Sequence, residues 1–167
     1  MTAQARSRAV AHRDSPDDPI TAVAPATASG SPHRRLLAPL LWGVVFGVVQ
    51  AASPLAFPWL DTATVYALGL TLIAAVYVGF AVADGRRHVL VVETVVASVF
   101  VVAAACAELG SAWLIVAGLA GHGLKDLWQH RTGFVAGTRW WPPFCATVDG
   151  VAAALIAVAL AANWLPA

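Results

Sequence analysis

The sequence predicts an all-α integral membrane protein, a polytopic bundle of five transmembrane helices. Three observations lead to this fold class. Apolar residues make up 59% of the 167 residues and charged residues only 11%, whereas roughly 25% charged residues is usual in a soluble domain. Five apolar stretches follow one another, each near the roughly 20 residues that a helix needs to cross a bilayer. All Lys and Arg residues fall on one side of the resulting arrangement.

The first 35 residues differ in composition from the rest of the chain. They carry half of the Lys and Arg residues, together with Pro, Ser, Thr and Ala and few large apolar side chains. Such a segment cannot bury enough surface to offset its conformational entropy. We therefore expect residues 1–35 to form a disordered cytoplasmic tail, followed by a transmembrane domain over residues 36–167.

The predicted helices follow from the apolar stretches and from the breaks between them. The fourth is the shortest, at about 27 Å for a rise of 1.5 Å per residue. The break between the third and fourth stretches, Glu108–Gly110, is so short that these helices must be antiparallel neighbours. A Pro pair, Pro142 and Pro143, suits the first turn of the fifth helix. The expected spans are residues 36–56, 63–83, 88–107, 111–128 and 144–164.

Small residues at helical spacing indicate close helix packing in two of these stretches. Gly43 and Gly47 form a GxxxG pair in the first. Ala146, Gly150 and Ala154 form a ridge of small residues in the fifth. Such residues allow two backbones to approach closely, either inside one bundle or between subunits of a homo-oligomer.

The distribution of Lys and Arg predicts the orientation. With the N-terminus inside, all ten Lys and Arg residues lie in inner regions, and the outer connections hold only Asp61 and Glu108. Positive charge is retained on the cytoplasmic side of membrane proteins. Five spans then place Ala167 outside. Arg34 and Arg35 before the first stretch would also suit a twin-arginine export signal, but the length of that stretch favours a retained anchor.

Polar residues within the third, fourth and fifth stretches lie at one depth. Glu93, His122 and Asp149 each lie five or six residues from the cytoplasmic end of their helix, or roughly 8–9 Å below the surface. Charged groups inside a membrane are costly and usually face the bundle interior. Lys125 and Asp126 flank His122 on the same helix, so the expected polar cluster is Glu93, His122, Lys125, Asp126 and Asp149.

Three interpretations of this cluster stay open. It can be a structural network that fixes the helix register. It can be an ion or proton site, because His with carboxylates suits a divalent metal or a proton relay, with His122, Asp126 and Asp149 as the metal ligands. The nearby cations can instead form a pocket for an anion or a lipid headgroup, built from Arg86, Arg87, Arg131 and Arg139.

An enzyme is an alternative to a non-catalytic bundle. His122 would then act as a general base oriented by Asp126, with Cys145 as a nucleophile. Cys145 and Cys106 are expected near opposite ends of the bundle, about 20 Å or more apart, which is beyond the roughly 7 Å that a disulfide allows. The topology and packing alone suit an accessory or oligomeric membrane protein, and the sequence indicates no particular cofactor.

The most distinctive segments are HGLKDLWQHR, from His122 to Arg131, and TRWWPPFCATVD, from Thr138 to Asp149. On these segments the chain resembles an uncharacterised bacterial family of small polytopic integral membrane proteins, a domain of unknown function, over roughly residues 77–154. The resemblance implies a helical fold in the bacterial cytoplasmic membrane and no specific reaction. The expected partners are the lipid bilayer and further copies of the chain, with no nucleic acid.

Overall fold

The computed structural model describes residues 32–165, with side chains from residue 37 onward. This part of the chain is all-α, as expected, and has five α-helices and one short 3-10 helix. Residues 1–31 of the predicted tail lie outside the described part of the chain. Its remaining residues, 32–35, belong to the first helix. The elements are α1 Pro32–Ala52, η1 Ser53–Ala56, α2 Thr62–Asp84, α3 Arg87–Leu109, α4 Trp113–Thr132 and α5 Trp141–Ala161.

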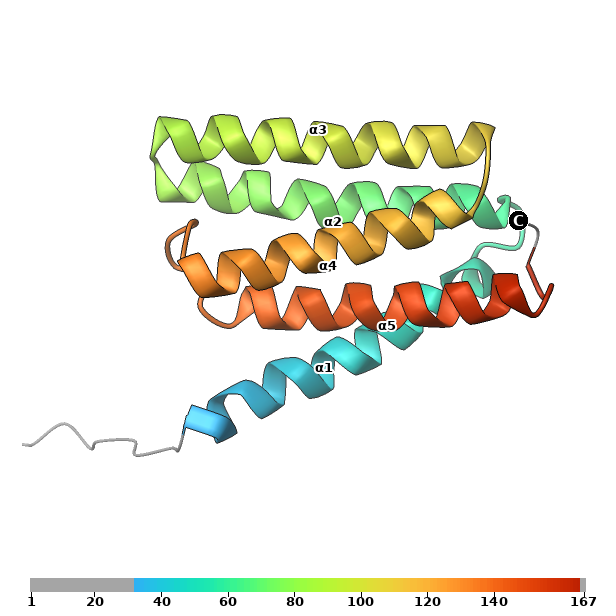
Figure 1. Cartoon of the computed structure of the whole chain (residues 1–167), viewed down its shortest axis with the longest axis horizontal. Helices are drawn as coiled ribbons and strands as arrows, with labels where there is room; N and C mark the ends of the chain where they lie inside the picture. The colour runs from blue at the N-terminus through green and yellow to red at the C-terminus, as the bar shows by residue number, and fades with distance from the viewer. Residues whose placement is uncertain (1–31, 166–167) are drawn as a thin grey trace, which may run out of the picture.

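The helices run up and down alongside one another (Figure 1). α1, α3 and α5 run in one direction, and α2 and α4 run in the other. The short turn after α3 makes α3 and α4 antiparallel, as predicted. The α2–α3 turn and the α4–α5 loop therefore share one end of the bundle, and the α3–α4 turn lies at the other end.

The helix ends differ from the expected bounds by one to four residues, and two of these differences bear on the site. α4 continues to Thr132, one turn beyond the expected end at Trp128, because its polar residues extend the helix and Gly133 ends it. Gly133 has a φ of 58° and its N–H donates to the Gln129 carbonyl, which is the usual left-handed helix terminus. α5 begins at Trp141, so the Pro pair occupies its first turn.

The GxxxG pair of α1 packs against α5 inside the bundle. A Cβ at Gly43 would lie 2.6 Å from the Thr147 Cβ, and a Cβ at Gly47 would lie 2.7 Å from the Val151 Cβ. Both distances are shorter than any real contact, so only glycine permits this approach. Gly150, in the predicted ridge of α5, is exposed and has no neighbour within 4 Å of its Cβ position.

The outer surface of the bundle is apolar. On α3, Val91, Val95, Val99 and Val102 are between 54% and 61% exposed, whereas soluble proteins rarely expose continuous apolar patches. Within residues 32–165, four helical segments are long and apolar enough to cross a membrane: Leu37–Ala56, α2, α3 and α5. α4 does not meet this criterion, because its polar residues lower its hydropathy.

Two groups of buried apolar residues fill the interior. The larger lies toward the α3–α4 turn and includes Leu70, Ile115, Leu119 and Ile156. The smaller lies toward the α2–α3 turn and includes Val89. Between these two apolar groups the interior contains the polar side chains of the candidate site.

The fold predicts that Gly43→Ala destabilises the protein, because the new methyl group would overlap Thr147. Overpacking a tight contact typically costs about 1–3 kcal/mol. Gly79→Ala and Gly150→Ala are matched controls, since both positions have open space at Cβ. Thermal unfolding of the detergent-purified variants measures the difference. Equal midpoints for all three would contradict the close α1–α5 contact.

Candidate functional site

One face of α4 carries the candidate site. His122, Asp126 and Gln129 lie at positions i, i+4 and i+7, which share a helix face, and none is more than 2% exposed. Toward the N-terminal end of α4, Ile115 and Leu119 lie on the same face and belong to the larger apolar group. The change from apolar to polar residues along this face places the site in the half of the bundle near the α2–α3 turn.

α5 brings a second carboxylate to this face. The His122 Nδ1 lies 2.7 Å from Asp149 Oδ2 and 3.5 Å from Asp126 Oδ2. Gly123 permits the approach of the two helices, because a Cβ there would already lie 3.3 Å from the Asp149 Cβ. His122, Asp126 and Asp149 thus form a compact group, hereafter the HDD cluster, in which one ligand atom from each residue lies within 4.8 Å of the others.

Several polar atoms of the HDD cluster have no hydrogen-bond partner among the described residues. Both carboxylate oxygens of Asp126 lack one, as do Asp149 Oδ1 and His122 Nε2. Asp126 and Asp149 are 0% exposed. Buried polar atoms are almost always paired, and leaving one unpaired costs about 1–3 kcal/mol, more for a charged group. The hydrogen-bonding capacity of the cluster is therefore only partly used by the described residues.

A second polar group lies beside the HDD cluster. Lys125 Nζ lies 2.7 Å from Glu93 Oε2 on α3, and the Gln129 side-chain amide donates to the other Glu93 oxygen. The Lys125 ammonium also lies 3.5 Å from the centre of the Tyr77 ring on α2, within the range of a cation–π contact. This group contains an ion pair, but Gln129 Oε1 and the Tyr77 hydroxyl also have no hydrogen-bond partner among the described residues.

Aromatic rings close the site from the α2 and α3 sides. The rings of Phe100 and Tyr77 have their centres 5.0 Å and 5.9 Å from that of His122. The imidazole is 1% exposed as a result. Residues of four helices thus surround His122.

The predicted cluster is found together, with one difference in its pairing. His122, Asp126 and Asp149 converge as expected, but Glu93 contacts Lys125 and Gln129 rather than His122. Sequence reasoning missed Tyr77 and Gln129. Gln129 could have been found from its spacing, since it continues the polar face of α4 beyond the expected helix end. Tyr77 gives no such signal, because a tyrosine in an apolar helix is ordinarily a packing residue.

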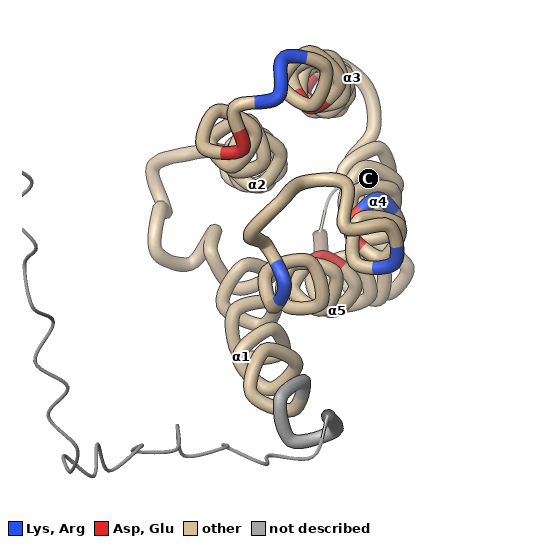
Figure 2. The backbone as a smooth tube through the Cα atoms, turned by 90° about the vertical axis from the view of Figure 1, so that its left-hand side faces the viewer, with Lys and Arg blue, Asp and Glu red and all other residues tan. Residues whose placement is uncertain are grey.

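The four arginines expected to bind an anion do not gather into one pocket. Arg86 donates to both oxygens of Asp84, at 2.6 and 2.7 Å, and to the Phe134 carbonyl at 2.6 Å. These bonds raise the pKa of the Arg86 guanidinium, chiefly through Asp84. Figure 2 shows basic residues spread around this end of the bundle, on the α2–α3 turn, α4 and the start of α5. The other three, Arg87, Arg131 and Arg139, are exposed.

The features expected of an enzyme are only partly present. His122 Nδ1 is closer to Asp149 than to Asp126, the residue expected to orient it. Cys145 is buried and Cys106 is exposed, and both thiols are free. The prediction that they form no intramolecular disulfide is confirmed.

The HDD cluster offers the donor set of a divalent metal site. One imidazole and two carboxylates suit zinc and related transition metals, which take three protein ligands where a further position stays open. Ligand atoms around a tetrahedral zinc lie about 3.3 Å apart, given bonds of roughly 2.0–2.1 Å. The 3.5 Å between His122 and Asp126 matches this value, and the 2.7 Å between His122 and Asp149 would widen on loss of their shared proton.

Comparisons with protein-family models, with curated proteins and with solved structures found no significant match. The function therefore has to be argued from the geometry of the chain itself.

Asp84 connects the two loops at this end of the bundle. Besides Arg86, its carboxylate accepts from the Ala136 N–H at 2.7 Å, and its side chain is 0% exposed. Asp84→Ala would leave the Ala136 N–H and the Arg86 guanidinium without this acceptor, and we expect a lower unfolding midpoint and a more accessible α4–α5 loop. Limited proteolysis between Gly133 and Thr138 and thermal unfolding measure the effect. Arg87→Ala is the control, and equal protease resistance of both variants would contradict the role of Asp84.

Proposed function

We propose that the chain is a metal-binding protein of the bacterial cytoplasmic membrane, with five membrane spans and a divalent transition-metal cation held by His122, Asp126 and Asp149. The observation that carries the proposal is the Asp126 carboxylate, which is fully buried beside two other metal-ligand side chains. It accepts no hydrogen bond in the described region, and its ion-pair contact there is with His122 Nδ1, at 3.5 Å.

The charges around the site favour a divalent cation. Glu93, Asp126 and Asp149 supply three negative charges and Lys125 supplies one positive charge. A divalent cation bound beside a neutral imidazole brings this sum to zero. A proton on His122 alone would leave one negative charge, which is costly in a membrane interior. The same balance favours metal binding over the more general accessory or oligomeric role, which needs no buried charge.

The proposal of five membrane spans rather than four depends on α4 crossing the membrane. The 20 residues of this helix correspond to about 30 Å at 1.5 Å per residue, the thickness of the hydrocarbon core. His122, Asp126 and Gln129 face the interior, whereas Leu124 and Leu127, on the outer side, are 67% and 45% exposed. The last turn of α4 carries the exposed polar residues His130, Arg131 and Thr132. A helix of this kind can span a membrane within a bundle although its average hydropathy is low.

The orientation rests on the charges of the connections. The arginines of the α2–α3 turn and the α4–α5 loop lie at one end of the bundle, and Asp61 and Glu108 lie at the other. The positive-inside rule places the arginine end in the cytoplasm. The resemblance to small bacterial integral membrane proteins supports a location in the bacterial cytoplasmic membrane. The lipid bilayer is then the partner of the apolar surface.

Reporter fusions test this topology. Fusions after Gly85 and Gly137 should show cytoplasmic activity, and a fusion after Ala167 should show external activity. The physical reason is that every basic connection then stays on the cytoplasmic side. A cytoplasmic Ala167 would mean that α4 does not cross the membrane.

Zinc titration of the detergent-purified, chelator-treated protein tests the site. We expect about one equivalent of zinc to bind. Asp126→Asn should weaken zinc binding at least about tenfold, because changing even a residue that only supports a metal ligand typically lowers the affinity by about that factor. Asp61→Asn, which removes an exposed carboxylate far from the site, is the control.

Thermal unfolding separates the proposal from a purely structural cluster. If Asp126 is only a buried charge, Asp126→Asn should raise the unfolding midpoint in both the presence and the absence of zinc, since an unpaired buried charge is destabilising. If it is a ligand, zinc should stabilise the wild type and not the variant. No zinc stabilisation of the wild type would overturn the proposed function.

A further inference from the structure

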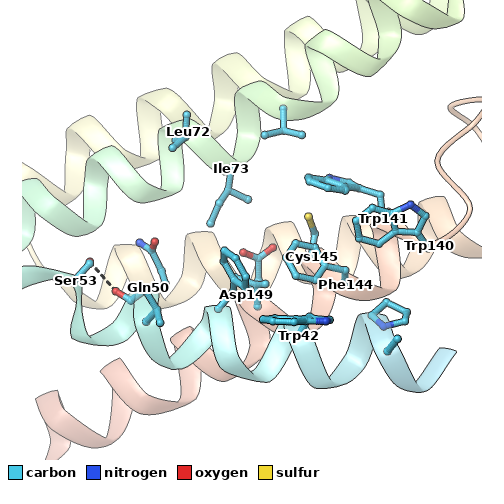
Figure 3. A pocket seen from close by; sticks show the side chains of 16 residues that line it. Trp42, Gln50, Ser53, Leu72, Ile73, Trp140, Trp141, Phe144, Cys145 and Asp149 are labelled. Carbon is cyan, nitrogen blue, oxygen red and sulfur yellow. Dashed lines mark hydrogen bonds between the residues drawn. The ribbon is translucent and has the colours of Figure 1, made fainter.

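A groove of about 810 Å³ opens on the side of the bundle between α1, α2 and α5 (Figure 3). It exists because α1 crosses α5 at Gly43 and Gly47 and has few contacts with α2. Its volume is within the range of about 300–1,000 Å³ found for small-molecule sites. Because its outer side faces the lipid-exposed surface, its occupant would enter from the bilayer.

The wall of the groove is apolar and rich in aromatic rings. Trp42 and Phe46 line it from α1, Ile73 lines it from α2, and Trp141 and Phe144 line it from α5. The rings of Phe46 and Phe144 meet edge to face, with centres 5.6 Å apart. Aromatic rings attract positive charge through the electron density of their faces, more strongly when water is excluded.

One carboxylate belongs to this apolar wall. Asp149 lines the groove together with Cys145, one turn before it on α5 (Figure 3). Asp149 uses Oδ2 for its contact with His122, whereas Oδ1 has no partner within the described chain. Because the residue is 0% exposed, a ligand in the groove would interact with its charge electrostatically rather than through a solvent-exposed contact. Charges interact strongly over several ångströms in a low-dielectric medium.

We propose that this groove binds a lipophilic organic cation, a molecule with delocalised positive charge and an apolar surface, held by the aromatic wall and by the charge of Asp149. Such a cation needs no hydrogen bond, which fits a carboxylate that lines the groove while being 0% exposed. The neutral hydrocarbon chain of a lipid would fit the volume, but it would gain nothing from Asp149.

Binding of the organic cation in the groove does not require a bound metal ion. A second consequence does rest on the proposed function. When the HDD cluster holds a divalent cation, the negative charge of Asp149 is already balanced. Zinc should therefore weaken the binding of the organic cation, and the organic cation should weaken zinc binding by the same factor.

Tetraphenylphosphonium is a suitable probe, measured by equilibrium dialysis against the full-length, chelator-treated protein in detergent. We expect saturable binding at one site and a loss of at least tenfold in affinity for Asp149→Asn. Asp126→Asn should change affinity less than Asp149→Asn does, because Asp126 does not line the groove. Trp42→Ala, on the lipid-exposed wall, should weaken binding, whereas Trp164→Ala should not. Asp149→Glu keeps the charge and should retain binding if Asp149→Asn fails to fold.

The outcomes separate the two proposals. Equal binding of triphenylphosphine oxide, a neutral analogue, or undiminished binding by folded Asp149→Asn, would overturn the cation site in favour of a neutral lipid groove. No saturable binding by the wild type would overturn it outright. Binding of the phosphonium without any binding of zinc would support the groove and overturn only the metal site. Antagonism by zinc in the wild type, absent in Asp126→Asn, would support both.

Discussion

The contact between His122 and Asp149 is the interaction on which the arrangement of the bundle depends. In a bilayer, polar side chains must find partners within the protein, because lipid supplies none. A helix with His122, Lys125 and Asp126 can lie in a membrane only if these residues face other helices. The contact at 2.7 Å fixes the rotation of α4 against α5, and the Lys125–Glu93 pair fixes it against α3. The apolar exterior of α4 follows from these two constraints.

Glycine makes this arrangement sterically possible at each contact of α5. Gly123 admits α5 to the polar face of α4, and Gly43 and Gly47 admit it to α1. Because α5 packs against both α1 and α4, it lies between these two helices (Figure 1). The same crossing that brings α1 against α5 leaves the space between α1 and α2, so the groove and the close packing have one cause.

Sequence reasoning predicted the fold and the members of the HDD cluster for a simple physical reason. Lipid requires long apolar segments, and it requires buried charges to meet, so depth along each helix grouped His122 and Asp149 together with Glu93. Asp126 joins this group because it lies four residues after His122 on the same helix face. Depth gives no information about rotation. The pairing of Glu93 with Lys125, and the packing of Tyr77 against that ammonium, depend on rotation and could not be predicted. Nor could the use of Arg86 as a connection between loops, since its acceptors, Asp84 and Phe134, come from two different segments.

The position of Gln129 indicates the end of the bundle toward which the polar part of the interior extends. Gln129 lines a cavity of about 300 Å³ at the arginine-bearing end, and through Glu93 and Lys125 it continues the polar side chains inward. Toward the opposite end, the interior of the described bundle contains Leu70, Leu119 and Ile156. Within the described bundle, polar side chains therefore line the interior toward the arginine-bearing end, and apolar side chains fill it toward the opposite end. If His122, Asp126 and Asp149 hold a metal ion, the ion would reach them from the arginine-bearing end of the bundle.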